Sequence, residues 1–215
     1  MAKHEQERLS FQGGVEFRDV APESATKDTI GTIRGVASVF DTETRIGSIF
    51  GEFIERVAPD AFDGALNRPD DVRALFNHDP GRVLGRTAAG TLRLSKTERG
   101  LTYEVDVPDT QTGHEVRSLI RRGDITGSSF GFKVPTKDDE TWDDDASPPI
   151  RTIRNVELFD VSPVTYPAYP ETSVEARSHA DAILGGDRTV TKATDARVAR
   201  LRSKINEDKS WTLDG

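Results

Sequence analysis

The sequence predicts an α+β protein that is mostly β, with its strands arranged as an antiparallel barrel or sandwich. Two observations carry this prediction. Many short segments are rich in β-branched and aromatic residues and are separated by turn residues. Few segments show helical spacing of apolar residues, so there are not enough helices to connect the strands of a parallel sheet.

The composition fits one folded domain with polar ends. The chain has 215 residues, which is long enough for a single domain with a real core. Only 34% of the residues are hydrophobic, and the mean hydropathy is -0.56. Part of the length is therefore expected to be poorly buried.

Charge and residue content exclude several classes of protein. The net charge of -8 and the pI of about 5.1 argue against nucleic acid as the main partner. The chain has no cysteine, which excludes disulfides, thiol catalysis and cysteine-ligated zinc. It has no apolar run of membrane-spanning length, and the N-terminus lacks the apolar core of a signal peptide. We therefore expect a soluble, intracellular protein without a membrane partner.

A series of segments is predicted to form strands. Residues 30–40 are rich in β-forming residues and contain Gly35, where a strand can bend. Residues 101–107 alternate apolar and polar side chains, which is the period of a half-buried strand. The other expected strand regions are 53–57, 72–76, 83–87, 91–95, 125–134 and 150–164.

Two segments among these strands are predicted to be helical. Residues 59–66 begin with Pro59, a residue that suits the first turn of a helix. Residues 112–122 carry apolar residues at helical spacing and basic residues near their end, and Gly123 is the expected stop.

The chain divides into three parts. Residues 1–28 are expected to be an N-terminal arm, residues 29–170 the folded domain, and residues 171–215 a polar, partly helical C-terminal tail. Both ends have few large apolar residues, so we expect them to be flexible and to pack weakly. Within the domain, residues 137–149 are acidic and end in two prolines, which predicts a loop.

Three polar residues beside or within apolar runs supply the side-chain types that a serine nucleophile needs. His78 offers a base, Ser129 a hydroxyl in a G-x-S-x-G pattern, and Asp160 a carboxylate to orient the base. Taken singly, each is compatible with an ordinary structural role, such as a histidine at a strand end or an outward-facing aspartate. Glu157 is the competing carboxylate.

Spacing alone leaves the kind of site open. The G-x-S-x-G pattern of α/β-hydrolases needs a strand-turn-helix context, but a second apolar stretch follows Ser129. The chain order histidine, serine, aspartate also differs from the chymotrypsin-like and subtilisin-like orders. Ser128 adjoins Ser129, and neighbouring side chains of a strand point to opposite faces, so only one of the two serines can face His78.

Three motifs and two further segments together carry a resemblance to a known family. The motifs are Phe76-Asn77-His78-Asp79, Thr126-Gly127-Ser128-Ser129-Phe130-Gly131-Phe132 and Leu158-Phe159-Asp160-Val161-Ser162-Pro163-Val164-Thr165-Tyr166-Pro167-Ala168. The further segments are Gly31–Phe40 and Val57–Phe62, in which Asp60 departs from the usual Pro-Gly-Ala-Phe. As a set they resemble the tailed-phage prohead (capsid maturation) serine protease family, over about residues 29–170.

The resemblance implies a serine endopeptidase with a fold related to that of the herpesvirus assemblins, a mostly antiparallel β-barrel with packed helices. Carried over by motif, His78 resembles the general base, Ser129 the nucleophile and Asp160 the third member of the triad. Backbone N–H groups around Ser129 and Phe130, or an arginine, are candidates for stabilising the oxyanion. No cofactor and no metal ion are implied.

The resemblance also implies partners and a location. The substrates would be scaffolding protein or the scaffold-like segment of the major capsid protein, cleaved inside the immature capsid (prohead) in the host cytoplasm during bacteriophage virion morphogenesis. Autocatalytic cleavage would accompany this, which makes either end of the chain a candidate for removal or for delivery of the protease into the shell. A homo-oligomer is compatible with this role, and neither nucleic acid nor membrane is expected as a partner.

Two other interpretations stay open at this point. A non-enzymatic capsid assembly or scaffolding protein could have the same fold with a dormant site, although all three catalytic-type residues are present. The acidic residues of segment 137–149 could instead bind a metal ion. Such a run is usually a solvated loop, and this one lacks the spacing of a calcium loop.

Overall fold

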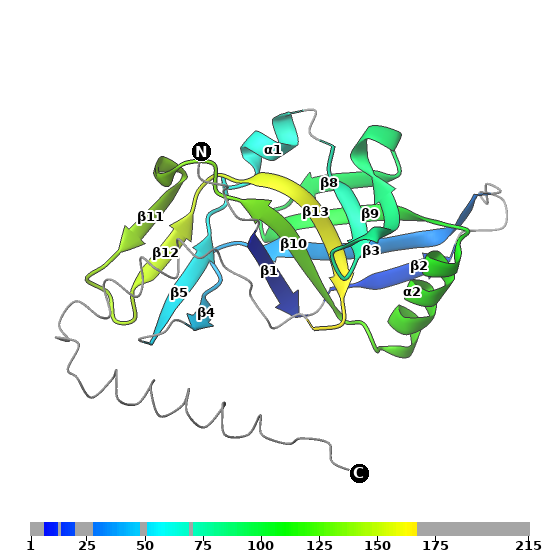
Figure 1. Ribbon diagram of the computed structural model, residues 1–215, viewed down its shortest axis with the longest axis horizontal. Helices are drawn as coiled ribbons and strands as arrows, with labels where there is room; N and C mark the ends of the chain where they lie inside the picture. Colours follow the sequence, from blue (N-terminus) through cyan, green and yellow to red (C-terminus); the bar gives the residue numbers. More distant parts are fainter. Residues whose placement is uncertain (1–6, 13, 20–27, 48–50, 69–70, 167–215) are drawn as a thin grey trace, which may run out of the picture.

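Three β-sheets form the framework of the protein in the computed structural model (Figure 1). The structure describes residues 7–12, 14–19, 28–47, 51–68 and 71–166. The C-terminal tail expected at 171–215 lies outside these described residues. No helix within the described ranges is long and apolar enough to cross a membrane.

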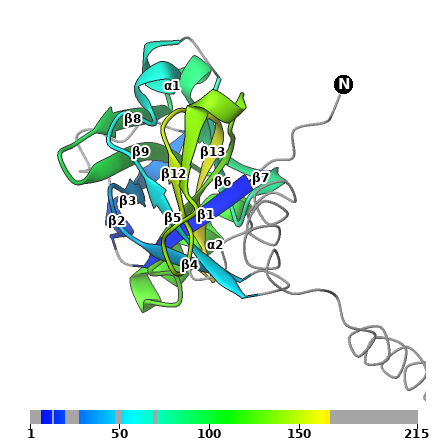
Figure 2. The same ribbon diagram turned by 90° about the vertical axis from the view of Figure 1, so that its left-hand side faces the viewer.

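Each sheet combines strands from distant parts of the chain. In pairing order, the five-stranded sheet contains β1 (Glu7–Gln12), β10 (Gly127–Lys133), β13 (Glu157–Val164), β6 (Arg73–Phe76) and β7 (Asp79–Arg86). One four-stranded sheet, which faces the viewer in Figure 2, contains β11 (Glu140–Asp143), β12 (Ile150–Ile153), β5 (Glu52–Val57) and β4 (Thr44–Gly47). The other contains β2 (Glu16–Asp19), β3 (Thr29–Val39), β9 (Gly100–Pro108) and β8 (Leu92–Lys96).

Most neighbouring strands are antiparallel, but β12 pairs with β5 and β13 pairs with β6 in parallel. None of the three sheets closes on itself within the described part of the chain. The mostly β character predicted from the sequence is therefore confirmed, whereas the antiparallel barrel is not. Apolar runs identify strands, but they do not specify which strands become neighbours.

Two helices pack against this framework, α1 (Asp63–Asn67) and α2 (Gln111–Arg122). At the start of α2 the side chain of Thr110 accepts a hydrogen bond from the N–H of Gly113. At its end Gly123 has a φ of 81°, a left-handed conformation that glycine adopts easily, so the predicted stop is confirmed. The other predicted helix is shorter than expected, because residues 59–62 form turns before α1 begins.

The first 28 residues, expected to be an arm, contribute the strands β1 and β2. Within β1, Glu7 and Leu9 are only 3% and 1% exposed. A charged residue at an inward position hides the alternation of apolar side chains by which a strand is normally found in a sequence. This is why no strand was predicted in the N-terminal segment.

The acidic segment 137–149, expected to be a loop, contains a short 3₁₀ turn at Lys137–Asp139 and the strand β11. Trp142 of β11 packs on Phe53 of β5, with ring centroids 5.3 Å apart. The carboxylate of Asp139 accepts hydrogen bonds from Thr136 and Asn155. The acidic composition of the segment therefore hid a strand, whose tryptophan packs on β5 within the same sheet.

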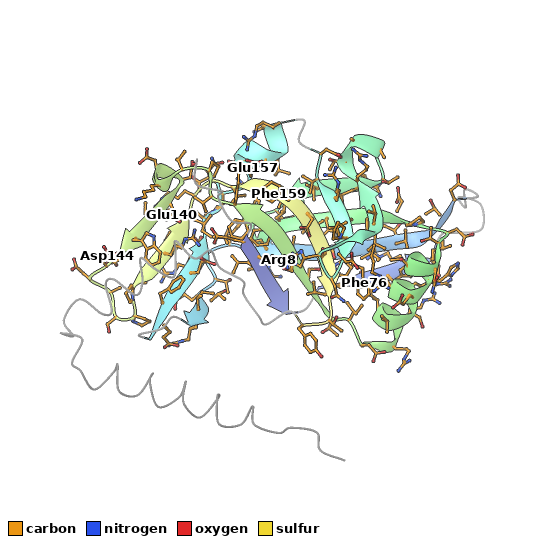
Figure 3. The ribbon with its side chains drawn as sticks, in the orientation of Figure 1. Arg8, Phe76, Glu140, Asp144, Glu157 and Phe159 are labelled. Atoms are coloured by element: carbon orange, nitrogen blue, oxygen red, sulfur yellow. The ribbon has the colours of Figure 1, made fainter. Side chains whose placement is uncertain are left out.

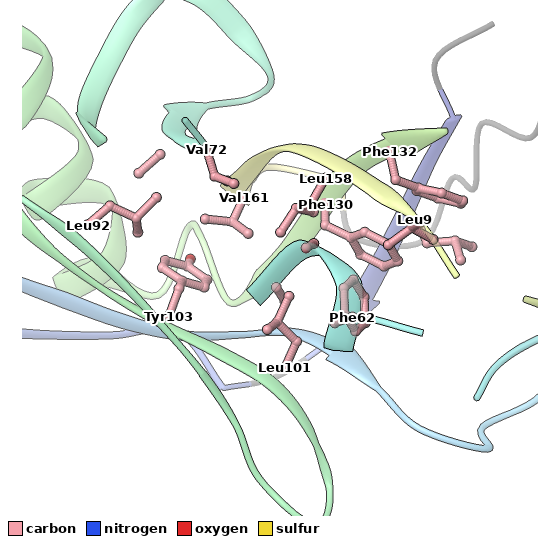
Figure 4. Packing of buried hydrophobic residues seen from close by; sticks show 14 of the residues in the cluster. Leu9, Phe62, Val72, Leu92, Leu101, Tyr103, Phe130, Phe132, Leu158 and Val161 are labelled. Carbon is pink, nitrogen blue, oxygen red and sulfur yellow. The ribbon is translucent and has the colours of Figure 1, made fainter. Parts of the chain in front are cut away.

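Aromatic residues of β10 lie at the centre of the hydrophobic core (Figure 4). The ring of Phe130 packs edge-on against Phe62 at 5.2 Å and stacks on Phe132 at 4.8 Å. Leu9 of β1 lies beside these rings in the same cluster. Such packing fixes the position of β10, the strand that carries both candidate serines.

Candidate functional site

A tight turn between β6 and β7 carries His78. Both Asn77 and His78 have positive φ values, 54° and 57°, a conformation that is uncommon outside glycine. The turn is held by β13 and the residue after it: the Asn77 N–H donates to the Pro163 carbonyl at 3.1 Å, and Asn77 Oδ1 accepts from the backbone N–H of Thr165 at 2.9 Å. These contacts fix the direction in which the imidazole points.

The structure brings the three sequence-predicted site residues into one hydrogen-bonded chain. His78 Nδ1 lies 2.6 Å from Asp160 Oδ1, and His78 Nε2 lies 2.7 Å from Ser129 Oγ. The side chains of His78 and Asp160 are only 8% and 4% exposed, and Ser129 is fully buried. Water is largely excluded from these side chains, and this strengthens electrostatic interactions between them. The carboxylate of Asp160 can therefore stabilise a positive charge that forms on the imidazole.

Ser162 is a fourth member of this site that the sequence reasoning missed. Its hydroxyl donates to Asp160 Oδ1 at 2.8 Å and accepts from the backbone N–H of His78 at 3.3 Å. Ser162 therefore connects Asp160 to the turn of His78, in addition to the direct contact between the carboxylate and the imidazole. Alternate residues of a strand point to the same face, so the position of Ser162 two residues after Asp160 could have placed it beside the carboxylate.

The two adjacent serines of β10 have different partners. Ser128 Oγ lies 2.9 Å from the hydroxyl of Tyr103 in a buried pair, whereas Ser129 Oγ faces His78. Burial raises the pKa of Tyr103, so its phenol keeps its proton and can donate to Ser128. The opposite orientations follow from the alternation of side chains along a strand.

Glu157, the competing carboxylate, lies elsewhere. Its side chain forms an ion pair with Lys133 at 2.6 Å. Figure 3 places Glu157 well away from Phe76, the residue that precedes the turn of His78. Of the two candidate carboxylates on β13, only Asp160 contacts the imidazole.

Strand β1 covers the candidate nucleophile, which the sequence did not predict. Ser10 lies directly opposite Ser129 in the antiparallel ladder of β1 and β10. The hydroxyl of Ser129 donates a hydrogen bond to the carbonyl oxygen of Leu9 at 2.7 Å. The N-terminal segment is thus part of the site.

A buried ionic cluster fixes the start of β1. Arg151 of β12 is 1% exposed and binds three carboxylates: Glu7 through Nη1 at 2.6 Å and Nη2 at 3.1 Å, Glu55 through Nη1 at 2.6 Å and Glu140 through Nε at 2.6 Å. Burial raises the pKa of Glu55 to about 7, and its Oε1 has no hydrogen-bond partner among the described residues. The cluster links β1 to the sheet of β5, β11 and β12.

A hydroxyl, an imidazole and a carboxylate in this order can carry out nucleophilic acyl transfer. The imidazole can take the proton of the hydroxyl, and the carboxylate can stabilise the resulting cation. In the described part of the chain, no three His, Cys, Asp or Glu side chains are grouped so that they could hold a metal ion.

Comparisons with known proteins agree with this chemistry. The sequence profile of the caudovirus prohead serine protease family matches residues 17–184. Among solved structures, the chain is similar to the capsid assembly protease gp21 of bacteriophage T4, with a TM-score of 0.50 and 14% sequence identity. That similarity covers 75% of this chain and 98% of the T4 chain, and at this identity it shows a shared fold. Comparison with curated protein sequences gave no match.

Proposed function

The chain belongs to the caudovirus prohead serine protease family, and from this premise we propose that it is a serine endopeptidase with Ser129 as nucleophile, His78 as general base and Asp160 as the orienting carboxylate. The observation that carries the proposal is the continuous chain of hydrogen bonds from Ser129 Oγ through the imidazole to Asp160. Each link is short enough for proton transfer or charge stabilisation.

The chemistry follows from these contacts. His78 Nε2 takes the proton of Ser129 as Oγ attacks the carbonyl carbon of a peptide bond, and Asp160 stabilises the imidazolium through Nδ1. The C–N bond then breaks, and the imidazolium gives its proton to the leaving amine. In the second half of the cycle, His78 takes a proton from a water molecule, whose oxygen attacks the acyl carbon. The bond between this carbon and Ser129 Oγ then breaks, and the imidazolium returns a proton to Oγ.

Ser162 positions the carboxylate during this cycle. A hydroxyl that donates to Asp160 while it accepts from the backbone of His78 keeps both groups in one geometry. For the oxyanion we predict stabilisation by hydrogen bonds from backbone N–H groups around Ser129 and Phe130.

The family is one of prohead proteases, which act in capsid maturation. We propose that the substrates are the scaffolding protein or the scaffold-like segment of the major capsid protein, cleaved inside the prohead in the host cytoplasm. Autocatalytic removal of residues from either end is part of this proposal, as is the division into an N-terminal segment, a protease domain and a C-terminal tail.

Co-expression with the cognate capsid and scaffolding proteins tests the proposal. The chain with its natural sequence and the Ser128→Ala variant should both process these proteins, because Ser128 faces Tyr103. The Ser129→Ala variant should leave them at full length, as seen by mass spectrometry. Normal processing by Ser129→Ala would refute the assignment. Processing by none of the three chains would favour a non-enzymatic assembly role.

A further inference from the structure

We propose that Arg73 and Arg86 form an anion subsite for the substrate, so that the protease prefers segments with an aspartate or glutamate about three residues from the bond that it cleaves. The proposal rests on the function proposed above, because it takes Ser129 as the nucleophile. It adds a chemical feature of the substrate that the triad alone does not specify. The two arginines and Asp71, which binds both, form the basic cluster.

The basic cluster lies on the same face of the five-stranded sheet as the triad. Arg73 of β6 is the partner of Asp160 of β13 in the parallel ladder, and Arg86 of β7 is the partner of Arg73 in the antiparallel one. The neighbours Ala74 and Val161 belong to the hydrophobic core. Because successive residues of a strand point to opposite faces, Arg73 and Asp160 both point away from the core.

Both guanidinium groups of the basic cluster are accessible to solvent. The side chains of Arg73 and Arg86 are each 47% exposed, whereas that of Asp71 is 25% exposed. Ion pairs with this exposure contribute little to the stability of a fold. A change in one of these arginines can therefore alter substrate binding while the chain stays folded.

The basic cluster carries more positive than negative charge. Asp71 Oδ1 accepts a hydrogen bond from Arg86 Nε at 3.0 Å, and Asp71 Oδ2 lies 3.1 Å from Arg73 Nη2. The hydrogen bond from Arg86 lowers the pKa of Asp71, so this carboxylate is ionised at neutral pH. Two guanidinium groups thus share one carboxylate, and the cluster keeps a positive charge in a chain whose net charge is -8.

The N–H donors of the basic cluster are already oriented. Arg86 binds both carboxylate oxygens of Asp71, and Arg73 Nη1 donates to the backbone carbonyl of Asp71 at 2.9 Å. A guanidinium has more N–H donors than one carboxylate can accept, so donors remain for a second carboxylate. A substrate acid that binds to groups held in this way loses less conformational entropy at the site.

The separation between the basic cluster and the nucleophile gives the position of the acidic residue in the substrate. The strands β10, β13 and β6 are successive neighbours in the sheet. Ser129 and Arg73 are therefore two strand spacings apart, which is roughly 10 Å. An extended peptide advances about 3.3 Å per residue, so about three residues cover this distance.

The alternative is that the basic cluster only connects β6 and β7 to the segments beside them. Asp71 also accepts a hydrogen bond from the backbone N–H of Ala88, at 3.3 Å, which fits such a role. The two interpretations differ in what they predict for Asp71→Asn. A structural connection becomes weaker when Asp71 loses its charge, whereas an anion subsite becomes more positive and binds a substrate carboxylate more tightly.

A matched pair of peptides measures the preference. Mass spectrometry of the cognate scaffolding and capsid proteins, co-expressed with the unchanged chain, identifies the cleaved bonds. The fastest of these sites is made as a peptide with its natural acidic residue and as a second peptide with the corresponding amide. The measured quantity is the ratio of kcat/KM for the acidic peptide to kcat/KM for the amide peptide. The full-length chains compared are the unchanged chain, Arg73→Gln, Asp71→Asn and the control Arg45→Gln, which removes an exposed arginine paired with Glu52.

The unchanged chain and Arg45→Gln should cleave the acidic peptide about five- to tenfold better than the amide peptide. Arg73→Gln should lower this ratio at least about threefold by slowing the acidic peptide alone, and Asp71→Asn should raise it. Thermal unfolding should give similar midpoints for all four chains. Cleaved bonds without a nearby acidic residue, equal slowing of both peptides by Arg73→Gln, or a ratio lowered by Asp71→Asn would overturn the proposal.

A fluorophosphonate probe separates this proposal from the proposed function, because it reacts with the nucleophile and has no carboxylate for the basic cluster to bind. Arg73→Gln and Asp71→Asn should be labelled on Ser129 as fast as the unchanged chain. If the unchanged chain is labelled but cleaves both peptides equally well, the anion subsite fails and the nucleophile stands. Absence of cleavage by the unchanged chain refutes the proposed function, and the subsite with it.

Discussion

The hydroxyl of Ser162 donates a hydrogen bond to the carboxylate of Asp160 at 2.8 Å and accepts one from the backbone of His78. The two side chains come from the same face of β13, and Ser162 is fully buried. The carboxylate is therefore held from two sides, by the imidazole and by this hydroxyl. Its orientation relative to His78 depends on a residue that takes no part in bond making.

Ser162→Ala should lower kcat about tenfold, because a hydrogen bond to a charged group contributes roughly 1.5–3 kcal/mol and only part of it acts in the transition state. KM should stay nearly constant, since Ser162 lies behind the triad. Steady-state kinetics on a capsid-derived peptide measures both constants. Ser162→Thr keeps the hydroxyl and should recover most of the activity. A Thr variant as slow as the Ala variant would show that packing, not the hydrogen bond, matters at this position.

Arg151→Met should strongly destabilise the folded chain, because it leaves the carboxylates of Glu7, Glu55 and Glu140 together without a cation. Breaking a buried ion pair from one side typically costs about 3–5 kcal/mol. Urea unfolding followed by circular dichroism measures the loss.

The matched control for Arg151 is Arg45→Ala, which removes an exposed arginine paired with Glu52. Pairs on the surface contribute little, so this variant should unfold close to the unchanged chain. Similar unfolding midpoints for the two variants would contradict the importance assigned to the buried cluster.

Stability should fall as the pH rises from about 5 to 7, through Glu55. Burial raises the pKa of Glu55 to about 7 from the usual 4.5. Between these values the folded state binds a proton that the unfolded state has lost, so raising the pH favours unfolding. The loss amounts to about 3 kcal/mol at most.

Denaturant unfolding at several pH values measures this slope, and the matched variant is Glu55→Gln. The amide cannot ionise, so its curve should be flatter over the same range. The charged neighbours of Glu55 are Arg151, Glu7 and Glu140, and all three remain in the variant. Parallel curves for the two chains would mean that Glu55 is not the group that titrates.

The local motifs of the sequence narrowed the site to His78, one of two adjacent serines and one of two carboxylates, and the family resemblance favoured Ser129 and Asp160. Each of them adjoins or lies within a run of apolar residues that forms a strand or ends one, and such runs can be recognised without knowing the fold. The choice between Ser128 and Ser129 could not be made in this way. It depends on which face of β10 turns to Tyr103 and which to His78, and this is a property of the assembled sheets.

The role of the N-terminal segment could not be predicted for a physical reason. Glu7 looks like a surface residue in the sequence, but its carboxylate is buried because Arg151, 144 positions later, binds it. An inward-facing charge is recognised only when its partner is known. The hydrogen bond from Ser129 to the carbonyl oxygen of Leu9 could not be predicted either, because the two residues are 120 positions apart in the sequence.

The most direct test of the triad is to find which residue reacts with a fluorophosphonate after long incubation of the full-length chain. Peptide mass spectrometry should locate the phosphonyl group on Ser129, and the His78→Ala variant should show almost no label at the same time point. Label on Ser128, or label on Ser129 that is independent of His78, would contradict the account.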